Sequence, residues 1–330
     1  MLTQDGRGFA GSRARGSEPG ILRGNRRESE QLAASEYDRL RTASREPANP
    51  RRYTEPMLFD VDAAVIENRR LSEHYSVLVL EAPAIAAATE PGQFVMLKPT
   101  RSTDPLLRRP FSVFEVIRNA DGAPSAISIL NKRTGAGTSL LYEAEPGATI
   151  GCLGPLGRPF EAVAPPAEAW MVAGGVGLAP FVTLALRLQQ LGTPSTLFYG
   201  ARTAAELYYV ELFERLGVHV VLATEDGSRG VAGRVTAPLA DALSAVGSEN
   251  EVKLSVCGPT PMMRAVARLA AEHRRPCDVS LEQVMGCGMG GCYSCVVLTR
   301  GDGQAPHFVR SCIDGPVFDS ARVVWEALTH

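Results

Sequence analysis

The stretch Ala169-Trp-Met-Val-Ala-Gly-Gly-Val-Gly177 joins a short apolar run to a cluster of glycines, and residues 178–191 after it have the pattern of a helix. A strand that turns through glycines into a helix is the opening of a βα unit, where free N–H groups and the helix dipole favour an anion such as a pyrophosphate. Tight βα turns also carry glycine for packing alone, so the motif is weak by itself. The candidate cofactor-binding residues here are Gly174, Gly175 and Gly177.

The βα pattern repeats toward the C-terminus. Further apolar strands are predicted at 195–199, 218–223 and 253–256. Thr203-Ala-Ala-Glu206 has the form of a capping box that opens a helix to about residue 216. Thr260-Pro261 predicts an N-cap followed by Pro at N1, for a helix that ends near His273. Repeated βα units indicate a doubly wound parallel sheet with its ligand at the carboxyl ends of the strands, and we expect this nucleotide-binding domain over residues 165–277.

Before Pro165-Pro166 the pattern is one of short strands separated by Gly and Pro. Few helical stretches lie between them, which is typical of a small antiparallel β-barrel. We expect this barrel domain over residues 57–164, with strands at 60–66, 74–80, 93–97, 111–117, 127–130 and 149–153.

Residues 1–56 differ in composition from the rest of the chain. They are rich in Arg, Gly, Ser and Pro and hold few large apolar residues, so they bury too little apolar surface to fold alone. We expect a disordered N-terminal extension, with a short helix over 29–44 as a possibility and a docking arm as the functional alternative.

The C-terminal part, expected as a module over residues 278–330, contains Cys287-Gly-Met-Gly-Gly-Cys292-Tyr-Ser-Cys295 and, further on, Cys312. Cysteines separated by four and then two residues, with a distal fourth, have the ligand spacing of plant-type [2Fe–2S] centres. The glycines between them let the backbone wrap closely and direct N–H groups at sulfur. A structural zinc site is the alternative, but such sites pair two CxxC or His-containing units and this chain has one CxxC.

Two further motifs in the barrel region have phosphate-binding chemistry. In Arg108-Arg-Pro-Phe-Ser112, an arginine can pair with a phosphate through two hydrogen bonds and the serine hydroxyl can donate to a flavin or phosphate oxygen. Gly135-Ala-Gly-Thr138 precedes a predicted helix start and can supply N–H donors to a second phosphate oxygen. Each motif alone is common at ordinary surface turns, but their order along the chain favours a cofactor site.

Composition excludes several classes of function. The formal net charge of −2 gives no reason to expect nucleic acid as a partner. No apolar run is long enough for a bilayer and no signal-peptide pattern precedes the first domain, so we expect a cytoplasmic protein with no membrane span. An odd number of cysteines, seven, crowded toward one end, favours metal ligation in a reducing compartment over disulfides. The five histidines are scattered and give no candidate catalytic group.

Taken together, seven motifs resemble the electron-transfer subunit of class 1B dihydroorotate dehydrogenase. The resemblance covers roughly residues 57–325. Its barrel and nucleotide motifs are shared with the wider ferredoxin–NADP reductase superfamily, whereas the cysteine module with its Asp-Gly-Pro-Val-Phe tail is more diagnostic. The motifs are Leu106-Leu-Arg-Arg-Pro-Phe-Ser112, Gly135-Ala-Gly-Thr138, Gly154-Pro-Leu-Gly157, Ala173-Gly-Gly-Val-Gly-Leu-Ala-Pro180, Cys257-Gly-Pro-Thr-Pro261, Ser280-Leu-Glu-Gln-Val-Met-Gly-Cys287 and Cys312-Ile-Asp-Gly-Pro-Val-Phe318.

The resemblance implies FAD on the barrel, a [2Fe–2S] cluster in the C-terminal module and NAD as electron acceptor. Its implied flavin- and phosphate-binding residues are Arg109, Pro110, Phe111, Ser112, Leu130, Asn131, Lys132, Gly137 and Thr138. Cys257 and Gly258 are implied at the cofactor site of the nucleotide domain, and the implied cluster ligands are Cys287, Cys292, Cys295 and Cys312. The chain departs from the family in its long N-terminal extension and at Phe111, where an aliphatic residue is common.

The resemblance also implies a catalytic partner. In the family, which serves pyrimidine biosynthesis, electrons from dihydroorotate reach FMN in a separate subunit and pass through [2Fe–2S] and FAD to NAD⁺, in a heterotetramer with two copies of each subunit. A flavin exchanges both single electrons and hydride, so it suits the place between a one-electron cluster and a nicotinamide. A barrel that holds FMN and dihydroorotate needs about 250 residues, which this chain does not have to spare.

Other functions remain open. The same module serves other complexes, such as a sulfide dehydrogenase or a bifurcating ferredoxin–NADP oxidoreductase, and a stand-alone oxygenase reductase is disfavoured by the short cysteine region. The non-enzymatic alternative is a zinc-bound structural or interaction protein. The choice between NAD and NADP is also open, because Arg202 after a predicted strand can receive a 2′-phosphate or be a solvated residue. Glu225-Asp226 follows a later strand, and we expect it to line the same crevice.

Overall fold

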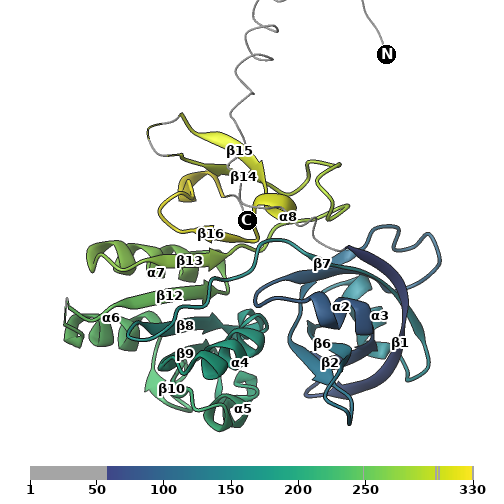
Figure 1. The fold of residues 1–330 in the computed structure, drawn as a ribbon, viewed down its shortest axis with the longest axis horizontal. Helices are drawn as coiled ribbons and strands as arrows, with labels where there is room; N and C mark the ends of the chain where they lie inside the picture. Colours follow the sequence, from purple (N-terminus) through teal and green to yellow (C-terminus); the bar gives the residue numbers. More distant parts are fainter. Residues whose placement is uncertain (1–57, 248, 302, 304, 329–330) are drawn as a thin grey trace, which may run out of the picture. The chain divides into compact units, whose positions relative to one another are not determined.

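The computed structural model describes residues 58–328 apart from 248, 302 and 304. These residues form an antiparallel sheet, a mainly parallel sheet and a small C-terminal unit that holds four of the seven cysteines (Figure 1). The predictions made for residues 1–56, a disordered extension with a short helix, lie outside the described residues. The expected combination of a β-barrel, an α/β domain and a C-terminal module is the one observed.

The first sheet has seven strands in the order β4-β3-β7-β1-β2-β6-β5, and all its pairs are antiparallel. Its core is made by alternate residues of neighbouring strands, such as Leu78, Leu80, Ile127 and Ile129, which are fully buried. Two helices, α2 (Pro83–Ala88) and α3 (Ala136–Glu143), accompany the strands. The strands are β1 (Phe59–Arg70), β2 (Tyr75–Glu81), β3 (Phe94–Lys98), β4 (Arg109–Ser112), β5 (Glu115–Arg118), β6 (Pro124–Lys132) and β7 (Thr149–Leu156).

The junction between β4 and β5 closes the barrel. The N–H of Val113 donates to the carbonyl of Gln93 next to β3 (3.0 Å), whereas the N–H of Phe114 donates to Ser128 in β6 (2.9 Å). Both side chains are buried, so the chain is held as it passes from one edge of the sheet to the other. The prediction of one strand over 111–117 was therefore wrong: hydrogen bonding to two different neighbours divides it into β4 and β5.

The second sheet has the order β11-β10-β9-β8-β12-β13-β16 and is parallel except at β16. The predicted doubly wound parallel sheet is confirmed, with the edge strand β16 added antiparallel from the C-terminal part. Apolar runs make the inner strands, as expected for strands covered on both faces. The strands are β8 (Glu168–Gly174), β9 (Ser195–Ala201), β10 (His219–Thr224), β11 (Val231–Ala232), β12 (Val252–Cys257), β13 (Cys277–Ser280) and β16 (Val317–Asp319).

Helices cover both faces of this sheet. Met171 and Ala173 of β8 share one apolar cluster with α4 (Phe181–Leu191) and α5 (Val210–Arg215). Trp170 and Val172 of the same strand share another with α6 (Thr236–Ala245) and α7 (Thr260–Glu272). Successive residues of a strand point to opposite faces, so the two clusters lie on the two sides of the sheet.

Two helix starts differ from the predictions. Thr203 makes no capping hydrogen bond, and only a 3₁₀ turn, η2 (Ala204–Glu206), follows it before α5 begins at Val210. The Glu206 carboxylate is instead bound by Arg202. Helix α7 has Pro259 as its N-cap, which makes Thr260 the first helical residue and shifts the predicted start by one position.

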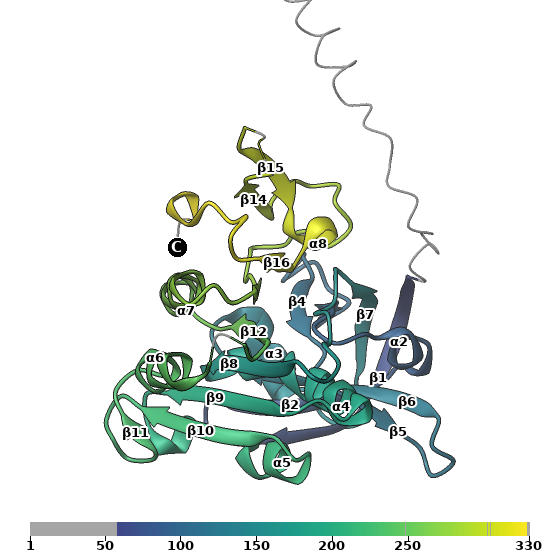
Figure 2. The same cartoon turned by 60° about the vertical axis from the view of Figure 1, so that its left-hand side comes forward.

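The C-terminal part packs on the barrel and on the parallel sheet (Figure 2). Its own sheet is the hairpin of β14 (Val296–Thr299) and β15 (His307–Arg310), followed by α8 (Ser311–Asp314) and, after β16, η3 (Trp325–Ala327). The N–H of Arg158, after the barrel, donates to Gly315 (2.6 Å), and the N–H of Ser320 donates to Cys277 at the start of β13 (2.8 Å). The module is thus held from both sides.

The division into domains at 164/165 and 277/278 stays a proposal. Strand β13 spans the second boundary, because it begins at Cys277 and runs to Ser280. Within the described part of the chain, no helix is both long and apolar enough to cross a membrane.

Candidate functional site

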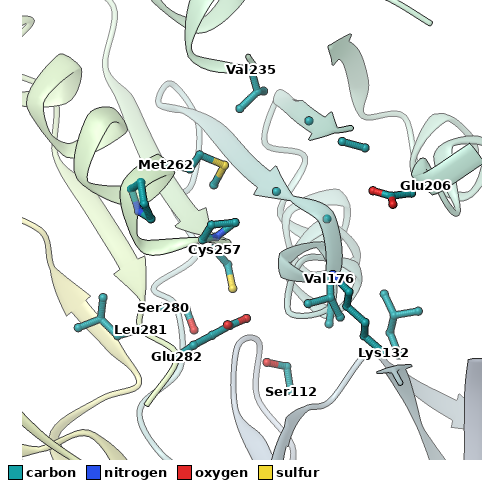
Figure 3. A pocket seen from close by; sticks show the side chains of 18 of the residues that line it. Ser112, Lys132, Val176, Glu206, Val235, Cys257, Met262, Ser280, Leu281 and Glu282 are labelled. Carbon is teal, nitrogen blue, oxygen red and sulfur yellow. The ribbon is translucent and has the colours of Figure 1, made fainter. Parts of the chain in front are cut away.

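A cavity of about 870 Å³ lies where the barrel, the parallel sheet and the C-terminal module meet (Figure 3). The barrel contributes residues of β4 and β6, the parallel sheet contributes the carboxyl ends of β8, β9 and β12, and the module contributes Ser280–Gln283 and Met285. This is the edge at which open α/β sheets bind ligands. The predicted site residues that line it are Pro110, Phe111, Ser112, Leu130, Lys132, Gly174, Gly175 and Cys257.

The predicted glycine turn after β8 is packed against the end of β12. A Cβ atom on Gly177 would lie 2.3 Å from the carbonyl oxygen of Cys257, and one on Gly258 would lie 3.0 Å from the backbone nitrogen of Gly174. Gly258 also has a φ of +152°, which favours glycine. Gly177 and Gly258 therefore allow two backbone segments to touch, and this contact leaves Gly174 and Gly175 facing the cavity.

The other predicted barrel residues form a group around the start of α3, beside the cavity. Arg109 packs over Gly137, where a Cβ atom would lie 3.3 Å from the arginine Cγ. The hydroxyl of Thr138 accepts the N–H groups of Thr134 (2.8 Å) and Gly135 (2.9 Å), which fixes the turn before the helix. Buried Asn131 donates to the Thr138 carbonyl (3.1 Å), so its amide ties β6 to α3.

The pattern of residues had not singled out Glu282 and Ser280, although both lie within a quoted motif. Cys257, Ser280 and Glu282 lie near one another in the cavity (Figure 3), and the Ser280 side chain is hydrogen-bonded to the Cys257 thiol. Burial raises the pKa of the Glu282 carboxyl, an effect that the positive charge of Lys132 opposes. Burial also raises the pKa of Cys257, so this thiol is neutral. A carboxyl with a raised pKa in a cleft is a candidate functional group.

Arg202, the candidate for a 2′-phosphate, lines the cavity but is already paired. Its guanidinium binds the Glu206 carboxylate through Nη2 and through Nε (3.2 Å). The hydrogen bond from Arg202 lowers the pKa of Glu206, which keeps the carboxylate charged. Glu225 also lines the cavity, as expected, whereas the Asp226 carboxylate accepts the Ser228 N–H (3.0 Å) in its own turn.

The four candidate cysteines are free thiols that differ in exposure. Cys292 is exposed, Cys287 is partly buried, and Cys295 and Cys312 are each 1% exposed. Cys287 interacts with Cys292, and Cys312 interacts with both Cys295 and Cys287, so the four thiols lie near one another. The N–H of Met289 also donates to the Cys287 sulfur (3.4 Å).

This donor set fits a two-iron cluster better than a single ion. Across residues 58–328, with the gaps given above, no three His, Cys, Asp or Glu side chains converge as the ligands of one metal ion. Four cysteines are the ligand set of [2Fe–2S] clusters, and these four thiols would supply such a set. Hydrogen bonds from Ser294 and Cys287 lower the pKa of Cys292 to about 6, so this sulfur is largely in the thiolate form that binds metal.

An apolar wall connects the thiols to the cavity. Cys295 and Cys312 pack in one buried cluster with Met285 and with four barrel residues, Phe94, Met96, Leu153 and Leu156. Two members of this cluster, Phe94 and Met285, also line the cavity. The two buried cysteines and the cavity therefore share apolar neighbours.

Two family models match the chain. The family described as the iron–sulfur cluster binding domain of dihydroorotate dehydrogenase B matches residues 282–324, which include all four candidate cysteines. The family described as an oxidoreductase NAD-binding domain matches residues 171–268.

Curated relatives match over most of their length. The dihydroorotate dehydrogenase B (NAD⁺) electron transfer subunit of Geobacillus kaustophilus (strain HTA426) is 40% identical over 263 residues, which cover 79% of this chain and 96% of that protein. The protein of the same name from Desulforamulus reducens (strain ATCC BAA-1160 / DSM 100696 / MI-1) is 36% identical over 265 residues, 80% of this chain and 98% of that one.

Solved structures share the fold. A chain from an NADH-dependent reduced ferredoxin–NADP oxidoreductase, described in the context of flavin-based electron bifurcation, aligns with a TM-score of 0.70 and 28% identity, over 81% of this chain and 91% of that one. The ferredoxin reductase of carbazole 1,9a-dioxygenase aligns with a TM-score of 0.56 and 24% identity, over 70% and 68% of the two chains, which is a likeness of fold.

The thiol geometry predicts a pH-dependent difference in reactivity. In the chain stripped of iron, alkylation of Cys292 by iodoacetamide should rise with pH to half its maximum near pH 6 and level off above, since the thiolate is the nucleophile. Cys312 should stay unmodified across this range, because burial raises its pKa to about 12. Mass spectrometry of peptides from timed reactions measures both.

The matched control is Ser294→Ala, which removes the main cause of the shift and should move the Cys292 midpoint upward. A Cys292 midpoint at the ordinary thiol value in the unaltered chain would contradict the geometry described for this loop.

Proposed function

The chain belongs to the family of dihydroorotate dehydrogenase B electron transfer subunits. We propose that it carries electrons to NAD⁺ from a catalytic subunit that oxidises dihydroorotate. The observation that carries the proposal is the apolar cluster that joins Cys295 and Cys312 to Phe94 and Met285, because the last two also line a nucleotide-sized cavity. This subunit is an oxidoreductase component with FAD, a [2Fe–2S] cluster and NAD as its cofactors, and it functions in pyrimidine biosynthesis. The reaction needs the partner, as a heterotetramer with two copies of each subunit.

We propose that FAD occupies the barrel side of the cavity. Pro110, Phe111 and Ser112 of β4 offer a surface with one hydroxyl to a flavin, and Leu130 with Lys132 continues it along β6. The group of Arg109, Gly137 and Thr138 at the start of α3 suits the phosphates, because a guanidinium and backbone N–H groups meet there.

NAD⁺ is assigned to the opposite side, over Gly174 and Gly175. The Arg202–Glu206 pair supports NAD over NADP, since the arginine is neutralised and a charged carboxylate lies beside it. A carboxylate can accept a hydrogen bond from the ribose 2′-hydroxyl of NAD and repels the 2′-phosphate of NADP. Cys257 and Glu282 also line the cavity, where we expect them to contact bound cofactor.

We assign Cys287, Cys292, Cys295 and Cys312 as the cluster ligands, and the match of residues 282–324 to the family's cluster-binding domain supports this. When bound, the cluster transfers single electrons, and a flavin converts between single electrons and a hydride. The protein brings the thiols near one another and excludes water from Cys295 and Cys312, because both are buried. Free thiols that bind iron need a reducing compartment, so we place the protein in the cytoplasm.

The catalytic subunit is the proposed occupant of an apolar surface around the exposed thiol. Met289, Tyr293 and Phe308 are 55%, 64% and 69% exposed. Phe308 and Arg310 lie on one face of β15, and Arg310 stacks on the Tyr293 ring at 5.3 Å, so these side chains form one surface beside Cys292. Exposed apolar patches of this kind mark protein interfaces.

The fold comparison supports a second candidate function, in which the chain is part of a ferredoxin–NADP oxidoreductase complex, because a chain of one such complex is 28% identical to this one. Identity to the dihydroorotate dehydrogenase B subunits is higher, at 40%. Co-expression with the FMN-containing catalytic subunit separates the two, because only the first function gives dihydroorotate-dependent reduction of NAD⁺.

Replacing Cys292 by Ser tests the cluster assignment. The visible absorbance of the cluster should be lost while most of the flavin remains, because the thiol belongs to the C-terminal loop and the barrel residues are unchanged. Absorbance spectra with iron and flavin analysis measure this, and Cys152→Ser in the barrel is the matched control. A cluster retained in full by the Cys292 variant would refute the ligand assignment.

Replacing Glu206 by Gln tests the choice of nucleotide. The change frees Arg202 to meet a 2′-phosphate, so the ratio of kcat/KM for NADPH over NADH should rise by about tenfold, or ~1.4 kcal/mol. Steady-state reduction of a dye acceptor by each nucleotide provides the measurement. Glu214→Gln, an exposed acid outside the cavity lining, is the control. An unchanged ratio in the Glu206 variant would show that the Arg202–Glu206 pair does not determine the preference for NAD over NADP.

Replacing Phe308 by Asp tests the partner surface. A charge in place of an exposed ring should weaken binding of the catalytic subunit by at least about tenfold, since aromatic anchors dominate interfaces. Calorimetric titration of the two subunits measures the dissociation constant, with the cluster content checked by absorbance. Leu140→Asp, at an exposed apolar position on α3, should leave binding unchanged; equal loss in both variants would contradict the assigned surface.

A further inference from the structure

The most exposed of the four thiols has a hydroxyl beside it. The Oγ of Ser294 lies 3.2 Å from the Sγ of Cys292. The same Oγ accepts a hydrogen bond from the N–H of Gly286 at 2.9 Å. The serine therefore lies between a backbone donor and a sulfur atom. Its one proton is available for the sulfur, because the contact with Gly286 uses only a lone pair of the serine oxygen.

The direction of the hydrogen bond between Ser294 and Cys292 follows from the chemistry of the thiol. A serine hydroxyl has one proton to donate and two lone pairs to accept. When Cys292 is ligated to iron it is a thiolate without a proton, so only the serine can be the donor. Gly286 N–H to Ser294 Oγ, and Ser294 O–H to Cys292 Sγ, then form a directed chain that ends on the sulfur.

The loop is shaped to hold this hydroxyl in place. Tyr293, between the two residues, has a φ of +57°, which is uncommon for a residue with a side chain. Its ring is covered by the Arg310 guanidinium, and Arg310 also donates to the carbonyl of Gly290 (3.0 Å). A Cβ atom on Gly286 would lie 3.2 Å from the Cys292 sulfur, so the absence of a side chain at this position lets the backbone segment with the donor N–H approach.

We propose that Ser294 is a positioning residue that raises the reduction potential of the cluster by donating a hydrogen bond to the Cys292 thiolate. The inference rests on the proposed assignment of Cys292 as a ligand. Transfer of one electron from a donor, dithionite in the test below, would reduce one Fe(III) of the cluster to Fe(II) and increase the negative charge on the bonded sulfurs, with no bond made or broken and no proton taken up. A hydrogen-bond donor stabilises the more negative state more strongly, which is how such bonds tune these centres.

The test is a reductive titration of the full chain with dithionite, with the reduced cluster followed by electron paramagnetic resonance. Ser294→Ala should keep the cluster but lower the ratio of reduced to oxidised cluster at a fixed potential by about tenfold, equal to a shift of about −59 mV for one electron. Ser294→Thr keeps the hydroxyl and should restore the potential of the unaltered chain. Tyr293→Phe is the matched control, because it keeps the ring on Arg310 and the hydroxyl of Ser294.

The outcomes separate this inference from the proposed function. An unaltered chain that binds no iron would overturn the function and the inference together. Clusters with equal potentials in the unaltered and Ser294→Ala chains would overturn the inference alone. Failure of Ser294→Thr to restore the potential, with Tyr293→Phe unchanged, would likewise exclude the hydroxyl and overturn it.

Discussion

The burial of two cysteine side chains against the barrel is the contact on which the rest of this structure depends. Cys295 and Cys312 pack with Met285 against Phe94 and Met96 of β3. This contact fixes the C-terminal loop on the barrel, and it removes water from Cys295 and Cys312. Cys287 and Cys292 stay nearer to solvent. The same loop therefore has one side packed on the barrel and another side open to a partner.

The residue pattern predicted the arrangement of the fold well where the signals were local. Glycines after an apolar run marked the βα turn at Gly174–Gly177, and cysteine spacing marked the thiol loop, because both depend on nearby residues along the chain. The single strand over 111–117 was wrong, since its division depends on hydrogen bonds to Gln93 and Ser128, which no pattern within the segment contains. The short helix α2 and helix α6 were not predicted, since Ala-rich segments with few large apolar residues give little periodicity.

The candidate site shows the same limit. The glycines and the β4 motif could be named from sequence because their chemistry is carried by the backbone or by adjacent residues. Glu282 could not, because its raised pKa comes from burial in a cavity formed by three separate parts of the chain. Arg202 was ambiguous for a related reason: whether a guanidinium is free depends on a neighbour, and here Glu206 has bound it.

The strand β16 has a consequence for engineering. It comes after the last cysteine, and it pairs with β13 through Asp278, Val279 and Ser280, so the parallel sheet ends in a strand supplied by the cysteine module. Excising the residues after β13 would leave the row of backbone groups on this strand unpaired, and exposed sheet edges of this kind promote aggregation. The metal-binding loop therefore cannot be moved alone. Grafting it onto another reductase requires the transfer of the sheet edge formed by β13 and β16 as well.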